Sequence, residues 1–158
     1  MSKTQKSAAA IQMLEEEHEK VRKAFAELEA MDPADEERCR QLVLDVCQDL
    51  RAHTTLEEEI FDPAVREAID DEELMNEAAV EHETAKMLIE QLENMDADDP
   101  NFHATFTVLG EYVRHHIKEE EGEMFPAAKK TGLDFDALAE EMRARKAELE
   151  GEMERTHA

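Results

Sequence analysis

The amino-acid sequence predicts an all-α protein: an up-down-up-down four-helix bundle built from two repeated helical hairpins, plus a C-terminal fifth helix. Three observations support this prediction. The 158 residues are rich in Ala, Leu, Glu and Met and contain only four Gly and four Pro, a composition typical of helices. Apolar residues recur three and four positions apart in four segments. The sequence also repeats itself at a spacing of about 64 residues.

Each of the four segments carries a seam of apolar residues that should face the interior of the bundle. A spacing of three and four residues brings such side chains to one face of a helix. The connections between the segments are short, so we expect neighbouring helices to run antiparallel. The seams run through residues 11–28, 39–60, 74–92 and 102–120.

The sequence offers two starts for the second helix. Asp32 followed by Pro33 is typical of a helix cap and a first turn. The repeat instead aligns Pro100, which opens the fourth helix, with Glu36 or Glu37. Because the two halves should fold alike, the repeat favours the later start.

Prolines and a capping acid divide the rest of the chain. Pro63 and Pro126 predict kinks or ends in the second and fourth helices, because proline removes a backbone donor. Asp134 can cap a fifth helix that should pack across the bundle. We therefore divide the chain into a four-helix bundle over residues 8–130 and a C-terminal helix and tail over residues 131–158.

The formal net charge of −24 leaves the chain without the basic footprint of proteins that bind nucleic acids or anionic membranes. We therefore expect neither as a partner. No stretch approaches the roughly 18 apolar residues of a membrane span, and residues 1–6 do not introduce the long apolar run of a signal peptide. Cys39 and Cys47 would lie about 12 Å apart along one helix, too far for a disulfide. Free thiols fit a reducing compartment, so we expect a cytoplasmic protein.

One motif occurs in both halves of the repeat. Residues 53–63 read HTTLEEEIFDP, and residues 116–126 read HIKEEEGEMFP. Each begins with His, has Glu four residues later and ends in Pro. The earlier half of each repeat carries Glu-His-Glu, centred on His18 and on His82. Each of the four helices thus contributes one His to the interior seam.

These histidines and glutamates form a predicted metal site. His and Glu four residues apart share a helix face, about 6 Å apart along the axis. A buried carboxylate needs a partner or a cation, and imidazole with carboxylate suits iron, manganese or zinc better than calcium or magnesium. The sequence therefore predicts a pair of metal ions, bridged by the glutamates and each with about one exchangeable position. The predicted ligands are His18, His53, Glu57, His82, His116 and Glu120.

The other His and Glu residues near these motifs are not expected to bind metal. A lone His on a helix seam is more often a core residue, and only the match across four helices favours ligands. His115 is turned about 100° from its neighbour on the seam, His103 has no counterpart in the repeat, and His157 lies near the terminus. We expect Glu58 and Glu121 on solvated faces, with ligation as the alternative.

Together these motifs resemble the hemerythrin-like, or HHE cation-binding, domain over roughly residues 8 to 130. The resemblance implies a non-haem di-iron centre with a bridging oxo or hydroxo group that reacts with dioxygen; manganese would accept the same donors. Oxygen carriers of this family have a second His one turn after the position of His82, where this chain has Lys86, and their last motif is longer and ends in Asp. The chain is more similar to bacterial HHE proteins linked with oxygen sensing, peroxide or nitric oxide handling, and iron–sulfur cluster repair.

The resemblance implies a di-iron protein that binds or reacts with dioxygen, hydrogen peroxide or nitric oxide, in oxygen or oxidative-stress sensing or in detoxification. Sustained turnover of peroxide or nitric oxide, with electrons from an unidentified donor, would make it an enzyme; stoichiometric binding would make it a sensor or store. The alternatives are a structural or interaction bundle with a zinc or manganese site, and an iron–sulfur cluster repair protein. Lys86, one turn after His82, either extends to solvent or directs its ammonium at an open metal position, where it would stabilise bound peroxide.

Overall fold

The structure, a computed structural model, describes residues 8–157 and the side chains of residues 8–154. The N-terminal residues considered above and the side chain of His157 lie outside this part. All regular structure in residues 8–157 is helical, as the sequence predicts. The elements are α2 (Ala9–Ala30), α3 (Glu36–Leu56), η1 (Glu57–Phe61), α4 (Asp62–Ala68), α5 (Glu72–Glu93), α6 (Phe102–Glu119), η2 (Glu120–Met124), α7 (Phe125–Lys129) and α8 (Phe135–His157).

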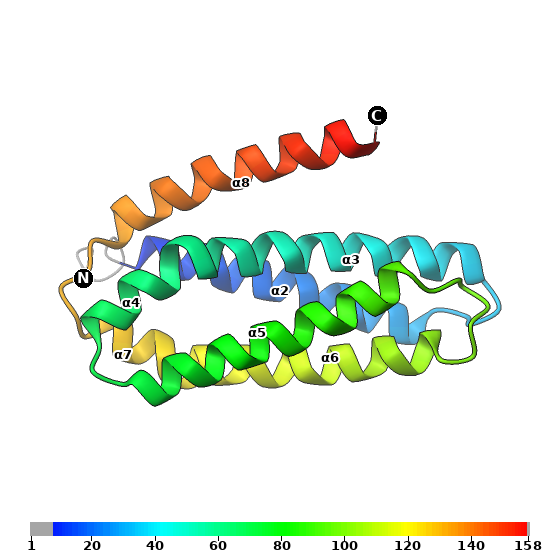
Figure 1. Cartoon of the computed structure of the whole chain (residues 1–158), viewed down its shortest axis with the longest axis horizontal. Helices are drawn as coiled ribbons and strands as arrows, with labels where there is room; N and C mark the ends of the chain where they lie inside the picture. Colours follow the sequence, from blue (N-terminus) through cyan, green and yellow to red (C-terminus); the bar gives the residue numbers. More distant parts are fainter. Residues whose placement is uncertain (1–7, 158) are drawn as a thin grey trace.

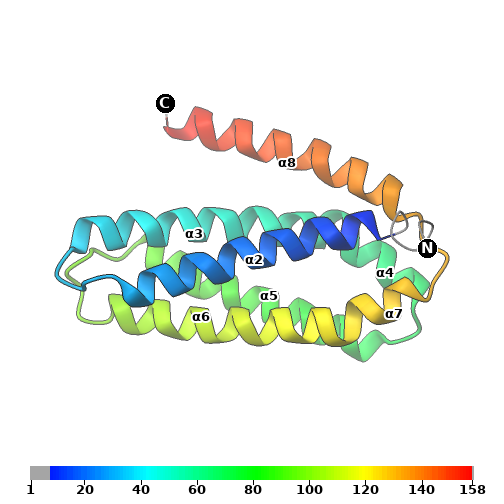
Figure 2. The same ribbon diagram turned by 180° about the vertical axis from the view of Figure 1, so that it is seen from behind.

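The long helices α2, α3, α5 and α6 form the bundle, and α8 lies outside it (Figure 1). The hairpin of α2 and α3 packs against the hairpin of α5 and α6, and the connections inside both hairpins lie at the same end of the bundle (Figures 1 and 2). The predicted four-helix bundle with a C-terminal fifth helix is therefore confirmed. None of the helices in the described part of the chain is long and apolar enough to cross a membrane.

The second bundle helix begins at Glu36, as the repeat predicts, and the start at Pro33 is wrong. Asp32 serves a turn instead: its Oδ1 accepts a hydrogen bond from the backbone N–H of Ala34 at 2.9 Å. The acid therefore stabilises the connection that precedes the helix, which is a role that Asp fills as readily as capping.

Pro63 and Pro126 neither end nor interrupt the second and fourth helices of the bundle. Pro63 and Pro126 lie at the second positions of α4 and α7, directly after the π-helical turns η1 and η2. In η1 the N–H of Asp62 donates to the carbonyl of Glu57, five residues back. A proline cannot donate and crowds the carbonyl four residues before it, and the wider turn accommodates this in both halves. Each π turn begins at a predicted bridging glutamate, Glu57 or Glu120.

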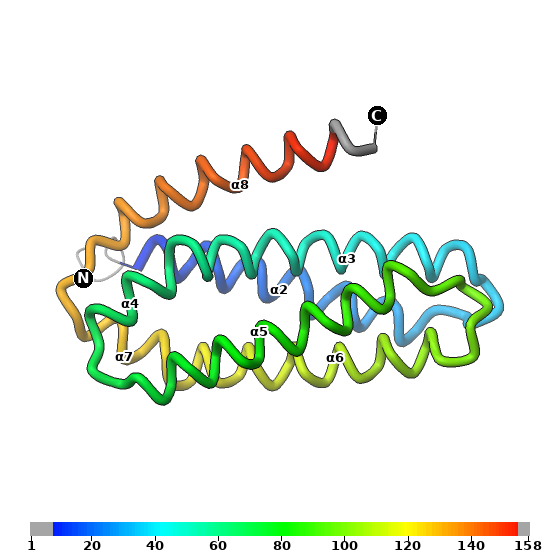
Figure 3. Tube along the Cα trace, in the orientation of Figure 1, coloured from blue at the N-terminus to red at the C-terminus, as the bar shows by residue number. Residues whose placement is uncertain are grey.

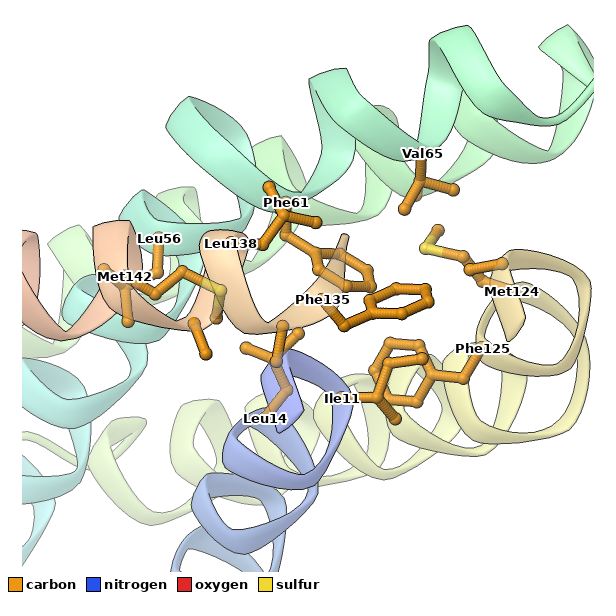
Figure 4. Packing of buried hydrophobic residues seen from close by; sticks show 14 of the residues in the cluster. Ile11, Leu14, Leu56, Phe61, Val65, Met124, Phe125, Phe135, Leu138 and Met142 are labelled. Atoms are coloured by element: carbon orange, nitrogen blue, oxygen red, sulfur yellow. The ribbon is translucent and has the colours of Figure 1, made fainter. Parts of the chain in front are cut away.

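Two apolar clusters fill the bundle on either side of the level of the histidines. Along α2, for example, Leu14 belongs to one cluster, His18 follows one turn later, and Val21 belongs to the other. Figure 4 shows the cluster at the end where the chain leaves for α8. Phe61 is the last residue of η1, and Phe125 is the first residue of α7. Their rings pack edge to face in this cluster, with centroids 5.6 Å apart. The polar site is thus enclosed between two dry layers.

Helix α8 joins the first of these clusters. Asp134 caps it as predicted, accepting from the N–H of Ala137 at 3.0 Å. Phe135, Leu138 and Met142 of its first turns are buried against the bundle (Figure 4). The rest of the helix runs along the outside of α2 and α3 (Figure 3). Helix α8 therefore packs along the bundle, on α2 and α3, and not across it as expected (Figure 3). The division into domains at residue 130 stays a prediction.

Candidate metal centre

The six predicted ligands meet at one level of the bundle, one His from each long helix and one Glu from each π turn. Their ligating atoms form two groups, and within each group these atoms lie within 4.8 Å of one another. Both groups contain the same two glutamates. The first group is His18, His53, Glu57 and Glu120, and the second is Glu57, His82, His116 and Glu120.

Each glutamate offers one oxygen to each group. Glu57 Oε2 lies 3.3 Å from His53 Nε2, and its Oε1 lies 3.0 Å from His82 Nε2. Glu120 repeats this arrangement, with Oε1 3.0 Å from His18 Nε2 and Oε2 3.1 Å from His116 Nε2. Each carboxylate therefore directs one of its two oxygens at one pair of imidazoles and the other oxygen at the second pair. This is the arrangement expected of a carboxylate that bridges two cations. That these six residues bind metal stays a prediction, which this geometry fits.

The buried polar atoms of the site need a partner that the protein itself does not provide. Glu57 and Glu120 are 0 % and 1 % exposed, yet neither oxygen of either side chain has a hydrogen-bond partner in the described part of the chain. The same holds for Nε2 of His18 and His53. Buried polar atoms without partners are costly and uncommon in native proteins. Two cations between these atoms would satisfy all of them, so the residues fit a metal pair.

Charge neutralisation in the metal-free protein falls to the imidazoles. Burial by itself would raise the pKa of Glu57, but the charge of His53 and the close approach of the neighbouring imidazole nitrogens lower it well below its usual value. Burial would lower the pKa of His53, but the carboxylates of Glu57 and Glu17 raise it well above its usual value. These opposite shifts favour an ionised Glu57 beside a protonated His53, and a bound cation would displace that proton.

A second ring of acids lies at the far nitrogen of each His. Nδ1 of His18 shares a hydrogen bond with Glu121 at 2.8 Å, whereas Nδ1 of His82 lies 3.3 Å from Glu58 without a hydrogen bond. Glu17 and Glu81 take the same place on the other two histidines, 2.7 Å from His53 and 2.6 Å from His116. A carboxylate at Nδ1 fixes the tautomer that leaves the Nε2 lone pair free for a metal.

Two expectations about these acids require correction. Glu58 and Glu121 do not lie on purely solvated faces, because each is half buried and contacts an imidazole. Neither is a ligand in either group. The roles of Glu17 and Glu81 were not predicted, although the repeated Glu-His-Glu triplet contained the signal. The acid before each His in that triplet serves the His of the adjacent helix, which only the packing of the helices reveals.

The ammonium of Lys86 binds an acid of this ring. Its Nζ lies 2.6 Å from Glu58 Oε1 and 3.3 Å from Glu83 Oε2. Glu58 in turn lies on the side of His82 that faces away from the metal groups. We therefore do not retain the alternative in which Lys86 contacts a metal-bound peroxide, and its side chain is not free in solvent either. Its repeat counterpart Arg22 binds Glu121 in the same way, at 3.0 Å.

The histidines that were not expected to bind metal lie outside the two groups. His115 is 64 % exposed and has Nε2 3.5 Å from Glu119. His103 is exposed.

Asp62 was not considered from the sequence; its Oδ1 is shielded from solvent without a hydrogen-bond partner in the described residues. Burial and the charges of Glu57 and Glu120 raise the pKa of Asp62 well above its usual value.

A small cavity adjoins the two groups. Its volume is about 30 Å³, and apart from the site residues its lining is mainly apolar, with Val21, Leu50, Val113 and Ile117 among the lining residues. A volume of this size accommodates one or two water-sized molecules. A cavity of this size beside the two groups has the volume of a diatomic or similarly small ligand.

Similarity to known proteins extends over most of the chain. A family model described as Hemerythrin HHE cation binding domain matches residues 9–128. A curated relative, a DNA nickase from Nostoc sp. (strain PCC 7120 / SAG 25.82 / UTEX 2576), is 27 % identical over 139 residues. The match covers 85 % of this chain but 38 % of that protein, so the chain spans less than half of the relative's length. The chain is also similar to a crystal structure of a Hemerythrin HHE cation binding domain-containing protein from Mycobacterium kansasii, with a TM-score of 0.75 and 23 % sequence identity. The superposition covers 89 % of this chain and 86 % of that one, so the two proteins have the same fold.

Proposed function

Because this chain belongs to the hemerythrin HHE cation-binding family, we propose that it is a non-haem di-iron protein that binds or reacts with a small oxidant. One observation carries the proposal: two pairs of imidazoles share the buried Glu57 and Glu120, and each glutamate presents one oxygen to each group. Bound iron would supply electrons to the oxidant and an open position beside it. Dioxygen, hydrogen peroxide and nitric oxide are the proposed ligands.

The residues of the chain would perform the remaining tasks. The four imidazoles and two bridging carboxylates would occupy about eight of the roughly twelve positions of two octahedral ions, which leaves room for a bridging oxo or hydroxo group and for the oxidant. Glu17, Glu58, Glu81 and Glu121 would hold the imidazoles in orientation. The apolar cavity of about 30 Å³ would limit the ligand to a few atoms.

The charge and the thiols bear on the setting of this function. With a net charge of −24, the chain is a poor partner for nucleic acids, and the nickase activity named for the longer relative is not proposed for it. Cys39 and Cys47 are both free thiols, which suits the cytoplasm. Sustained reduction of nitric oxide would need an electron donor of unknown identity.

Metal content and the visible spectrum of the purified protein test the proposal. We expect two irons per chain and a charge-transfer absorption that dithionite abolishes. His53→Ala and Glu120→Ala should each lose iron and most of the absorption, because each removes a donor from the shared set. His103→Ala, at an exposed position outside both groups, is the matched control and should keep both. Two zinc ions, or full iron retention in both ligand variants, would overturn the proposal.

Kinetics separate an enzyme from a sensor. A catalyst should consume many equivalents of peroxide, or of nitric oxide with a reductant, while its iron content stays constant. A sensor or store should bind about one equivalent per metal pair and then autoxidise slowly. Transfer of iron to an apo iron–sulfur protein, without oxidant consumption, would instead favour the cluster-repair alternative.

A further inference from the structure

The acids that hold the histidines are themselves bound by basic side chains, and one of these comes from outside the repeat. Arg22 on Glu121 and Lys86 on Glu58 are repeat counterparts within the bundle. A third basic residue, Lys146, comes from α8, and its Nζ lies 2.8 Å from Glu17 Oε2. The first repeat therefore depends on the fifth helix for a contact that the bundle does not supply.

Lys146 continues a chain of contacts that ends at a predicted ligand. Glu17 is 13 % exposed and uses its two oxygens differently. Oε2 accepts from Lys146, and Oε1 lies 2.7 Å from His53 Nδ1. His53 Nε2 then faces Glu57 in the first metal group. One ammonium group thus fixes the plane of the carboxylate that orients this imidazole.

The equivalent position in the second repeat is built differently. Glu81 Oε1 lies 2.6 Å from His116 Nδ1, as expected from the repeat. Its other oxygen lies 4.0 Å from Nε2 of His115, an imidazole that is 64 % exposed. Helix α8 packs on α2 and α3, whereas Glu81 and His115 lie on α5 and α6. The acid that orients His53 is therefore bound by a lysine of α8, whereas the acid that orients His116 has no hydrogen bond or ion pair with α8 in the described residues.

We propose that Lys146 is a positioning residue for the cation bound by His18 and His53, and that α8 is therefore part of the metal centre. This inference rests on the proposed metal pair. Loss of an acid bound to a ligating His weakens metal binding about 10- to 100-fold. Lys146 acts one contact further out, so its loss should weaken the affinity of one of the two positions by about 10-fold. The position held by His82 and His116 keeps its own contacts and should be unaffected.

The contacts of α8 explain how Lys146 is brought to Glu17. Phe135, Leu138 and Met142 anchor the start of the helix in the apolar cluster, about one turn before the lysine (Figure 4). Arg145 adds an ion pair with Glu59, 2.8 Å from Nε to Oε1, and this pair does not touch an orienting acid. Arg145 therefore separates two effects that Lys146 combines, the docking of α8 and the placement of Glu17.

The experiment titrates the metal-free full chain with Co²⁺ against a chromogenic chelator and fits two binding constants. Lys146→Gln removes the positive charge and shortens the side chain, and Lys146→Arg keeps a charged donor of similar reach. Arg145→Gln weakens docking alone, and Arg143→Gln removes one positive charge from an exposed position of the same helix. We expect Lys146→Gln to lower one constant about 10-fold, and the other three variants to leave both constants within about twofold of the unsubstituted chain. Thermal unfolding of the metal-free variants checks that each is folded.

A second measurement identifies the histidine concerned. In the Co²⁺-loaded protein each Nδ1–H proton should give a shifted, exchangeable NMR signal, and Lys146→Gln should accelerate solvent exchange of the His53 signal alone. Unchanged binding constants and exchange rates in Lys146→Gln would overturn the inference. So would an equal loss in Arg145→Gln, because docking would then be the cause. If the unsubstituted chain does not bind two Co²⁺ ions, it is the proposed metal pair that fails.

Discussion

At the scale of single residues, the two nitrogens of each core His have separate tasks. Nε2 faces a shared glutamate, and Nδ1 faces an acid from another helix. The second contact fixes the orientation of the ring without touching the metal position, so it should control affinity and not stoichiometry. The two tasks can be separated by changing an orienting acid while the ligands stay intact.

Glu121→Gln should weaken metal affinity by about 10- to 100-fold, because a neutral amide holds the Nδ1–H of His18 less firmly than a carboxylate does. Competition titration with a chelator measures this change. Glu123→Gln, an exposed acid in the same π turn, is the control and should leave the affinity unchanged. Equal affinities of the two variants would contradict the assigned role of Glu121.

Asp62→Asn should stabilise the metal-free protein at neutral pH. The pKa of Asp62 is raised on folding, so the native state keeps a proton that the unfolded chain releases above about pH 3.9. The free energy of unfolding therefore falls as the pH rises from about 3.9 to the pKa of Asp62 in the folded protein. Urea unfolding should therefore show a gain of about 1 kcal/mol at pH 7 and almost none below pH 4. An identical difference at both pH values would exclude a titration of Asp62.

At the scale of elements, a close contact in the middle of α6 sets the packing of its helix. A Cβ at Gly110 would lie 3.1 Å from two atoms of the Phe25 ring. This ring is 1 % exposed and stacks on Phe106, so it has little room to yield. Crowding in a filled core therefore outweighs the higher helix propensity of alanine.

Gly110→Ala should accordingly destabilise the protein by about 1 kcal/mol, although alanine favours helices. Gly122 in η2 is the matched control, because a Cβ there would meet no atom within 4 Å. Gly122→Ala should stabilise by up to about 1 kcal/mol. Denaturant unfolding of both metal-free variants measures the pair, and a stabilised Gly110→Ala variant would show that Phe25 can move.

At the scale of the whole molecule, the metal pair should join both hairpins and stabilise them together. Each group combines donors from both halves of the repeat, so unfolding either hairpin releases both cations. The metal-free molecule carries −24 formal charges and buries two glutamates in its centre. Cations should therefore contribute strongly to its stability.

Iron loading under anaerobic conditions should raise the melting temperature by about 10–20 °C, since each of the two ions at a hundredfold excess over its Kd adds about 2.7 kcal/mol. Calorimetry with and without Fe²⁺ measures this effect. Glu120→Ala, which lacks a shared donor, should gain much less from iron. A melting temperature that does not respond to Fe²⁺ would show that the native state holds no iron at this site.

Much of the molecule was predictable because its signals are local. The period of three and four residues predicts the helices. The duplicated His-x-x-x-Glu motif and the repeated Glu-His-Glu triplet together predict the six residues that meet between the four long helices of the bundle. The π turns were not predicted, because a proline signals only that the ordinary hydrogen-bond pattern stops. The orienting acids Glu58 and Glu121 were misplaced, since a Glu-Glu pair reads equally well as a solvated face.

The sequence by itself determined the helical bundle, its two-fold repeat and the identity of the inward-facing His and Glu residues, because these depend on spacing along one helix. Only the tertiary structure decided which acid holds which imidazole, since Glu17 and His53, or Lys146 and Glu17, lie on different helices. Contacts between helices depend on their rotation and relative height, which the packing of the apolar clusters sets and which no spacing within a single helix encodes.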